Sequence, residues 1–221
     1  MSIKKGDFIE INYTGRLADG EKECFDTTYE DVAKKEGIFS QKTKYGPVKI
    51  IVGEHHVIPG IDRNLEGKEI GKYTFKIADV EAFGKKSAQL LKLVPSRVFA
   101  KEQIKPYPGL QINMDNEMGV VKNVSGGRII VDFNHPLASK DVEYDVEIKR
   151  IITDNSEKIN VFFSLVGLKA ENISIDGDKA VISFKVELPD ELKKPLVDDL
   201  KRFTGLKTID FEVLKKESKK D

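Results

Sequence analysis

The chain has 221 residues, and its 37 Lys and Arg balance its 37 Asp and Glu, so the formal net charge is zero. A balanced charge gives no large field to attract nucleic acid or anionic lipid, and we expect neither as a partner. No run approaches the ~20 apolar residues of a membrane span, and residues 1–6 hold no apolar signal core. The single cysteine, Cys24, allows no disulfide within the chain. These features predict a cytoplasmic protein of one to three small domains.

The most informative stretch is a strand, a loop and one short helix. An apolar run at 48–52 predicts a strand that stops at Gly53, and the helical spacing of Ile61 and Leu65 predicts a short helix. In the loop between the strand and the helix, Pro59 has no N–H and Gly60 tolerates unusual dihedral angles. This loop can therefore place the N–H of Ile58 at the mouth of an apolar cup. A free donor beside apolar walls suits a ligand carbonyl.

The remaining pattern before residue 85 and after residue 132 predicts a compact antiparallel sheet. Alternating apolar side chains predict strands over 7–13, ended by Gly15, and over 73–80. Another strand begins at Cys24, and residues 30–46 are polar, as in a surface loop with a helical turn near 32–35. The last strand of this sheet arrives only at 142–152. We therefore predict an α+β fold with a separate domain inserted into it.

Residues 86–132 have their own β pattern, with strands predicted at 89–94, 110–114, 119–124 and 128–131 and a short helix beginning at Pro95. A domain of this size cannot cover all of its apolar side chains, and exposed apolar surface marks a binding surface. We expect unfolded clients to bind there. The candidate client-binding residues are Leu90, Leu93, Val98, Phe99, Ile104, Tyr107, Met114 and Met118.

Residues 154–221 predict a small α+β domain of order α-β-β-α-β. Asp154 and Glu157 have capping-box spacing before an amphipathic helix, and a second helix is predicted from Pro195 to Phe203. About 65 residues is marginal for independent stability, so we expect this domain to pack on a second copy of the chain, as a homodimer. The lysine-rich end, 215–221, is predicted to be a solvated tail.

Four motifs in order resemble the FKBP-type peptidyl-prolyl cis-trans isomerases: Phe25-Asp26-Thr27-Thr28, Val57-Ile58-Pro59-Gly60-Ile61, Ala82-Phe83-Gly84 and the strand 142–148. The resemblance covers 1–153 and is greatest to the SlyD-like, long archaeal branch, in which a second domain follows the Ala-aromatic-Gly element. It implies an FKBP-like half-barrel sheet around a short helix. The implied domains are an isomerase domain (1–85 and 133–153), an inserted flap or chaperone domain (86–132) and the C-terminal domain (154–221).

The resemblance also implies a site without nucleophile, metal or cofactor. Its catalytic residues would be Tyr13, Asp26, Phe83 and Tyr144, and its substrate-binding residues Phe25, Val57, Ile58, Ile61 and Leu137. Ile58 would offer its N–H, Asp26 would orient a hydroxyl or carbonyl, and the rings would hold proline. Three positions depart from the family: Ile61 replaces a common Trp, Phe83 a common Tyr, and Tyr144 a common Phe.

Other interpretations stay open from the residues alone. Aromatic and branched side chains on strands are usually core packing, and Asp26 could be a turn carboxylate. His55 and His56 are adjacent, and only His135 joins them, so we predict no zinc site. The predicted function is an isomerase that accelerates folding, with chaperone activity from the insert. The alternative is a non-catalytic holdase chaperone or peptide-binding scaffold.

Overall fold

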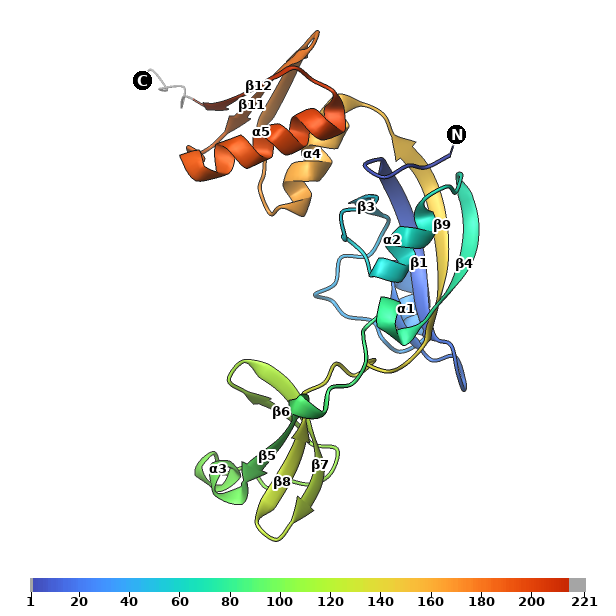
Figure 1. The fold of residues 1–221 in the computed structure, drawn as a ribbon, viewed down its shortest axis with the longest axis vertical. Helices are drawn as coiled ribbons and strands as arrows, with labels where there is room; N and C mark the ends of the chain where they lie inside the picture. Colours follow the sequence, from blue (N-terminus) through green and yellow to red (C-terminus); the bar gives the residue numbers. More distant parts are fainter. Residues whose placement is uncertain (1, 215–221) are drawn as a thin grey trace. The chain divides into compact units, whose positions relative to one another are not determined.

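The structure is a computed structural model that describes residues 2–214, and the chain forms two compact units (Figure 1). The first unit combines Met1–Lys76 with Glu143–Asp221, and the second is Ile77–Val142. The predicted tail at 215–221 lies outside the described residues. No helix within residues 2–214 is both long enough and apolar enough to cross a membrane.

The first unit is built on a five-stranded sheet. Its strands are β1 (Phe8–Leu17), β2 (Cys24–Thr27), β3 (Val48–Ile51), β4 (Gly71–Ile77) and β9 (Val142–Ile152). The order is β2-β1-β9-β4, and β3 pairs with the N-terminal half of β1. The predicted strand at 142–152 is confirmed as β9, and the structure places it between two early strands, β1 and β4.

The prediction that Gly15 ends the first strand is wrong. Strand β1 continues to Leu17, and its register with β2 shifts between Gly15 and Arg16. A glycine has no side chain to pack and usually weakens a strand, but β1 accommodates Gly15 in ordinary extended backbone.

Two short helices complete the isomerase part of this unit. Helix α1 (Glu30–Lys35) begins two residues before the predicted turn. Helix α2 (Pro59–Leu65) begins with the proline, whose missing N–H is not needed in a first turn, and it buries Ile61 and Leu65. Figure 1 shows α2 in the same unit as the five-stranded sheet, after β3 and before β4 along the chain.

The second unit is a four-stranded antiparallel sheet of order β5-β8-β7-β6. Its elements are β5 (Leu91–Pro95), α3 (Ser96–Lys101), β6 (Gln111–Met114), β7 (Glu117–Ser125) and β8 (Arg128–Asp132), after 3-10 turns at Asp79–Glu81 and Ala88–Leu90. One small core holds it together. The buried core residues are Val94, Phe99, Ile112, Val121, Ile129 and Val131.

Residues after β9 form the predicted α-β-β-α-β module. Its elements are α4 (Asn155–Leu165), β10 (Asn172–Asp176), β11 (Lys179–Phe184), α5 (Asp190–Thr204) and β12 (Thr208–Val213). Asp154 caps α4 as predicted, accepting the N–H of Glu157 at 2.7 Å. Strand β12 runs parallel to β11, and α5 supplies the crossover that a parallel pair requires.

The prediction that the second helix of the module begins at Pro195 is wrong. Helix α5 begins at Asp190, and Pro195 lies inside it and is exposed. Two acidic residues in the first turn, Asp190 and Glu191, favour the earlier start, and Gly205 in the left-handed conformation ends the helix.

The module packs on the isomerase sheet of its own chain. A single cluster of buried residues joins Phe8 and Ile51 of the sheet to Phe162, Phe163 and Phe203 of the module. The rings of Phe8 and Phe203 meet edge to face, with centroids 5.5 Å apart. Part of the apolar surface expected to face a second copy is therefore covered within one chain.

A charged network borders this contact. Arg150 at the end of β9 binds Glu10 of β1 at 2.7 Å and Glu157 of α4 at 2.6 Å. Lys49 of β3 also binds Glu157, at 2.8 Å. Each ion pair is partly exposed, so we expect the network to contribute less than the apolar contact beneath it.

Candidate active site

Four predicted site residues meet on the inner side of β1, β2 and β9. The ring of Tyr144 lies edge to face against both Tyr13 and Phe25, with centroids 5.7 Å apart in each pair. The Tyr13 hydroxyl donates a hydrogen bond to the Asp26 carboxylate. These four side chains, which we call the aromatic cup, form an apolar wall with one carboxylate at its edge.

The bulge in β2 explains how two neighbouring residues both reach the cup. Gly15 pairs with Asp26 and Arg16 pairs with Cys24, which leaves Phe25 as the extra residue. Successive strand residues normally point to opposite faces, but an extra residue re-aims its side chain. Phe25 thus contacts Tyr144 while Asp26 contacts Tyr13.

Gly15 is a site residue that the sequence analysis missed. A Cβ atom at this position would lie 2.7 Å from the Tyr144 ring and 2.9 Å from the Phe25 ring. Its backbone dihedral is ordinary for a strand, so the glycine is required by close approach and not by conformation. Its spacing from Tyr13, two residues along a strand, could have placed it on the same face.

Burial sets the electrostatics of the cup. Burial, followed by the charge of Asp26 and the hydrogen bond to it, raises the pKa of Tyr13 to about 12. Burial raises the pKa of Asp26 above its ordinary value of 3.8, against the opposing effect of the Tyr13 hydrogen bond. The pKa of Tyr144 is raised in the same way, mainly by burial. Tyr13 therefore stays a hydrogen-bond donor at neutral pH. By solvent accessibility Tyr144 is buried, Tyr13 and Phe25 are half-buried, and Asp26 lies exposed at the edge of the cup.

Two threonines of the Phe25-Asp26-Thr27-Thr28 motif fix the backbone of Tyr13. Thr28 accepts the Tyr13 N–H on its Oγ1 at 2.9 Å and donates its own N–H to the Tyr13 carbonyl at 2.9 Å. The Thr27 hydroxyl donates to the same carbonyl at 3.1 Å. Both threonines are buried, so this motif locks β1 to β2 where Tyr13 and Asp26 meet.

The start of α2 presents the predicted backbone donor. Ile58 caps the helix, and its carbonyl accepts the N–H groups of Ile61 and Asp62 at 3.0 and 3.1 Å. In the described part of the chain, no protein acceptor takes the Ile58 N–H. Val57 and Ile58 are half-buried, and Ile61 is only 2% exposed. A ligand carbonyl can therefore use this N–H without displacing a protein bond.

A second residue missed from the sequence is Asp62. Its carboxylate is 5% exposed and accepts the N–H groups of Gly53 at 2.7 Å and His55 at 3.1 Å. Both of those residues have positive φ, +82° and +58°. Asp62 thus holds the strained turn that leads to Val57 and Ile58.

Phe83 and Leu137 belong to the second unit and have their own local setting. The Phe83 ring stacks on His135, with centroids 4.6 Å apart and planes 2° apart. The N–H of Leu137 donates to Nδ1 of the same histidine at 3.2 Å. His135 thus organises both predicted residues, and their part in the cup stays a prediction.

The predicted client-binding residues of the insert divide by exposure. Leu93, Ile104, Tyr107 and Met118 are exposed by 40 to 60%. Leu90, Val98 and Met114 are half-buried. Phe99 is only 4% exposed and belongs to the core of the unit, because α3 turns it onto the sheet.

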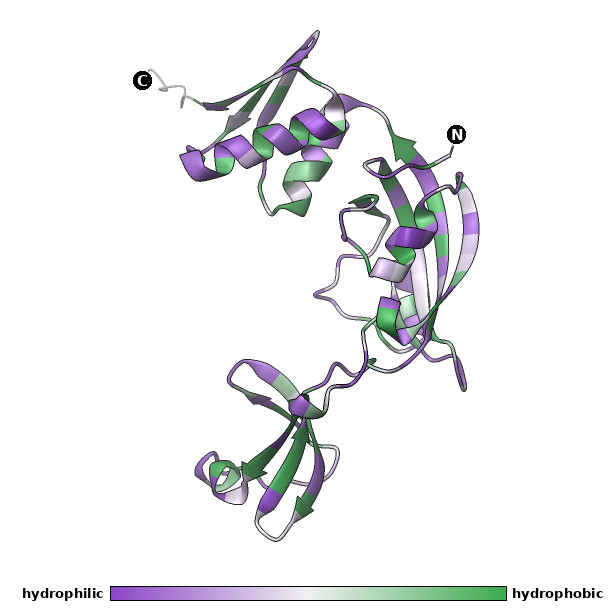
Figure 2. Cartoon of the chain, in the orientation of Figure 1, coloured by the Kyte–Doolittle hydropathy of each residue, from purple (hydrophilic) through white to green (hydrophobic). Residues whose placement is uncertain are grey.

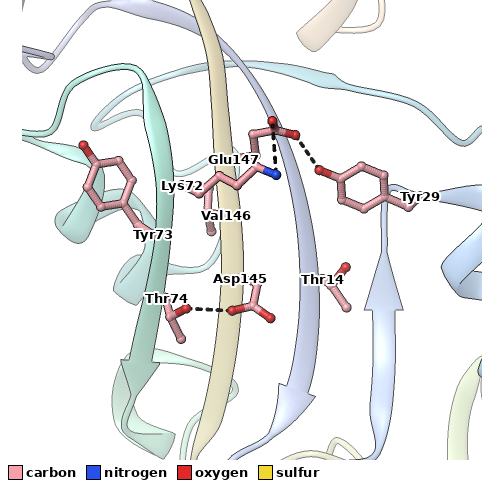
Figure 3. Close-up of a pocket in the computed structure, with 8 residues that line it drawn as sticks. All are labelled: Thr14, Tyr29, Lys72, Tyr73, Thr74, Asp145, Val146 and Glu147. Carbon is pink, nitrogen blue, oxygen red and sulfur yellow. Dashed lines mark hydrogen bonds and ion pairs between the residues drawn. The ribbon is translucent and has the colours of Figure 1, made fainter.

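A different hollow, of about 380 Å³, lies on the other face of the first unit's sheet (Figure 3). Thr14 and Asp145 line it, and each neighbours a cup residue on its strand, so they point to the opposite face. Two carboxylates in this hollow already accept hydrogen bonds. Asp145 accepts the Thr74 hydroxyl at 2.7 Å, and Glu147 accepts the Tyr29 hydroxyl at 2.7 Å.

The groups assembled in the cup suit non-covalent chemistry. A phenol and a carboxylate border aromatic rings, which can grip an apolar ring, and we expect the Ile58 N–H to hold a neighbouring carbonyl. Within residues 2–214, no three His, Cys, Asp or Glu side chains gather as metal ligands would.

Comparisons with known proteins show which family the chain belongs to. A family model described as "FKBP26, IF domain" matches residues 92–137, within the second unit. The FKBP-type 16 kDa peptidyl-prolyl cis-trans isomerase of Escherichia coli is 31% identical over 156 residues, which are 68% of this chain and 94% of that protein. The chain therefore belongs to the FKBP-type peptidyl-prolyl cis-trans isomerase family.

Other relatives agree. The short-type peptidyl-prolyl cis-trans isomerase of Methanocaldococcus jannaschii is 28% identical over 70% of this chain and 98% of its own length. The SlyD isomerase of Vibrio cholerae is 29% identical over 72% of this chain and 73% of its own. The match to the crystal structure of FkpA from Escherichia coli spans 68% of this chain and 42% of FkpA, at 18% identity and with a TM-score of 0.33.

Proposed function

We propose that the chain accelerates cis-trans isomerisation of X–Pro bonds in the aromatic cup. The observation that carries this proposal is the Tyr13–Asp26 hydrogen bond inside a wall of rings, in a member of this isomerase family. Rotation about the X–Pro amide faces a barrier of roughly 20 kcal/mol. A gain of about 10⁴ in rate requires lowering it by only ~5.5 kcal/mol.

The mechanism needs no covalent step. A water-poor, apolar cup disfavours the dipolar planar amide relative to the twisted amide, in which resonance is lost. Phe25 and Tyr144 would enclose the proline ring, and the Ile58 N–H would bind a carbonyl beside it. The Tyr13 hydroxyl, oriented by Asp26, supplies a second fixed dipole at the cup edge.

We further propose that the insert binds unfolded clients on the uncovered face of its sheet. Val94, Ile129 and Gly119 point toward the buried side, so their neighbours Leu93, Ile130 and Met118 point to the other face. Leu93 pairs directly with Ile130 across β5 and β8. Figure 2 shows hydrophobic residues along these strands, and adaptable side chains such as Met118 suit varied clients.

One assay separates the isomerase from the alternative holdase. Isomerisation of a short X–Pro peptide is followed by NMR exchange with the whole chain, and aggregation of an unfolded protein is followed beside it. An isomerase accelerates peptide exchange at catalytic amounts. A folded chain that suppresses aggregation but leaves peptide exchange unchanged would make the protein a holdase, and the cup only a peptide pocket.

The C-terminal module also supports a proposal of self-association in the cytoplasm. Strand β12 is an edge of the three-stranded sheet, and its last residue, Val213, and the next residue, Leu214, are 45% and 44% exposed. A free edge with apolar ends can pair with the same edge of a second copy. Light scattering of the full chain should give a dimer that Val213→Lys reduces to a monomer, while Val186→Lys, at another exposed valine, leaves it unchanged. A wild-type monomer would exclude the dimer.

A further inference from the structure

The turn that precedes Val57 and Ile58 is held from two sides. On the isomerase side, Asp62 binds the N–H groups of Gly53 and His55. On the other side, Arg202 of helix α5 forms a two-point contact with Glu54, at 2.8 and 3.3 Å. The central residue of this turn is thus bound by a side chain from the C-terminal module.

Arg202 is well placed to hold the turn still. Its guanidinium also binds Asp199, one helical turn earlier, at 3.0 Å. It lies 4.2 Å from the centre of the Phe203 ring, which itself packs against Phe8 of β1. A planar guanidinium fixed by a carboxylate and a ring presents the two-pronged geometry that a second carboxylate requires.

The effect of this contact reaches Ile58 through one residue, Asp62. Asp62 donates its N–H to the Ile58 carbonyl at 3.1 Å, while its carboxylate holds the two residues that flank Glu54. A displacement of Glu54 is therefore passed to the start of α2.

We propose that Arg202 is a positioning residue for isomerisation, through which the C-terminal module sets the Ile58 N–H by way of Glu54. This inference rests on the proposed function of the cup. It gives the module a role in turnover that does not depend on whether the chain forms a dimer.

The test compares Arg202→Ala with Arg150→Ala in the full chain. Arg150 belongs to the same junction but binds Glu10 and Glu157 and does not touch the turn. We expect Arg202→Ala to lower kcat/KM for a short X–Pro peptide by about three- to tenfold, below the ~100-fold cost of misplacing a group by 1 Å. It should also shift the amide resonance of Ile58. Arg150→Ala should lower stability and leave both readouts near wild type.

Two further variants separate positioning from loss of folding. Arg202→Lys keeps one charge and should retain part of the activity, and the exchanged pair Glu54→Arg with Arg202→Glu should recover more than either single change. The proposal is overturned if Arg202→Ala leaves kcat/KM and the Ile58 amide unchanged, or if Arg150→Ala lowers activity equally. An inactive wild-type chain would instead refute the isomerase function itself.

Discussion

Gly15 lies directly opposite Asp26 in the β1–β2 ladder. The residue over which the rings of the aromatic cup pack most closely is therefore paired with the residue that supplies the carboxylate of the cup. The rings of Tyr144 and Phe25 close over this glycine, and the bulge beside it turns Phe25 inward. The shape of the cup thus depends on the absence of one methyl group.

Gly15→Ala should damage the cup more than the fold. The new methyl forces the two rings apart, which we expect to cost ~1–3 kcal/mol of stability as overpacking and to lower kcat/KM at least tenfold. Gly20→Ala is the control: its φ of +70° makes alanine strained there, but nothing lies within 4 Å. Equal activity loss in both variants would show that backbone strain, and not the rings, is responsible. Peptide isomerisation and urea unfolding measure the two effects.

Tyr13→Phe removes the hydroxyl that binds Asp26 and keeps the ring. A hydrogen bond to a charged group contributes about 1.5–3 kcal/mol. If most of this energy stabilises the twisted X–Pro amide, its loss should lower kcat/KM roughly tenfold. The matched control is Tyr29→Phe, which loses its bond to Glu147 on the other face of the sheet. Unchanged activity in Tyr13→Phe would mean that the phenol is a packing group only.

Acid should weaken the contact between the isomerase sheet and the module. The guanidinium of Arg150 and the ammonium of Lys49 lower the pKa of Glu157 from 4.5 to about 2. Because the pKa of Glu157 is lower in the folded state than in the unfolded state, its ionised carboxylate stabilises the fold above pH ~4.5. This contribution is lost as the pH falls toward ~2. For a partly exposed network we expect about 1 kcal/mol. Urea unfolding between pH 6 and pH 2.5 should therefore be less pH-dependent in Glu157→Gln, and an unchanged slope would contradict this role.

Client binding by the insert can be tested without touching the cup. Leu93→Ser with Met118→Ser removes two side chains that are 58% and 60% exposed, so stability should change by less than about 1 kcal/mol. We expect normal turnover of a short peptide and slower proline-limited refolding of a whole protein, because the local concentration of client falls. Val186→Ser, 71% exposed in the C-terminal module, is the control. Equal loss on both substrates would refute this division of roles.

The sequence predicted the helices and strands better than the tertiary contacts between them. Alternation and capping residues were enough for β9, α2 and α4, because these signals are local. The inward turn of Phe25 could not be predicted, since it depends on one unpaired residue in a register set by tertiary pairing. The packing of the module on Phe8 was missed for a related reason: an apolar helix face does not specify its partner.

The position of β9 between β1 and β4 has a consequence for the order of synthesis. When Asp132 at the end of β8 has left the ribosome, the insert has all of its strands, while the isomerase sheet still lacks the strand that joins its two halves. The second unit can therefore fold first, with its own core, and the isomerase sheet must wait until Ile152 is made. In a growing chain, the proposed client-binding surface would exist before the proposed isomerisation site.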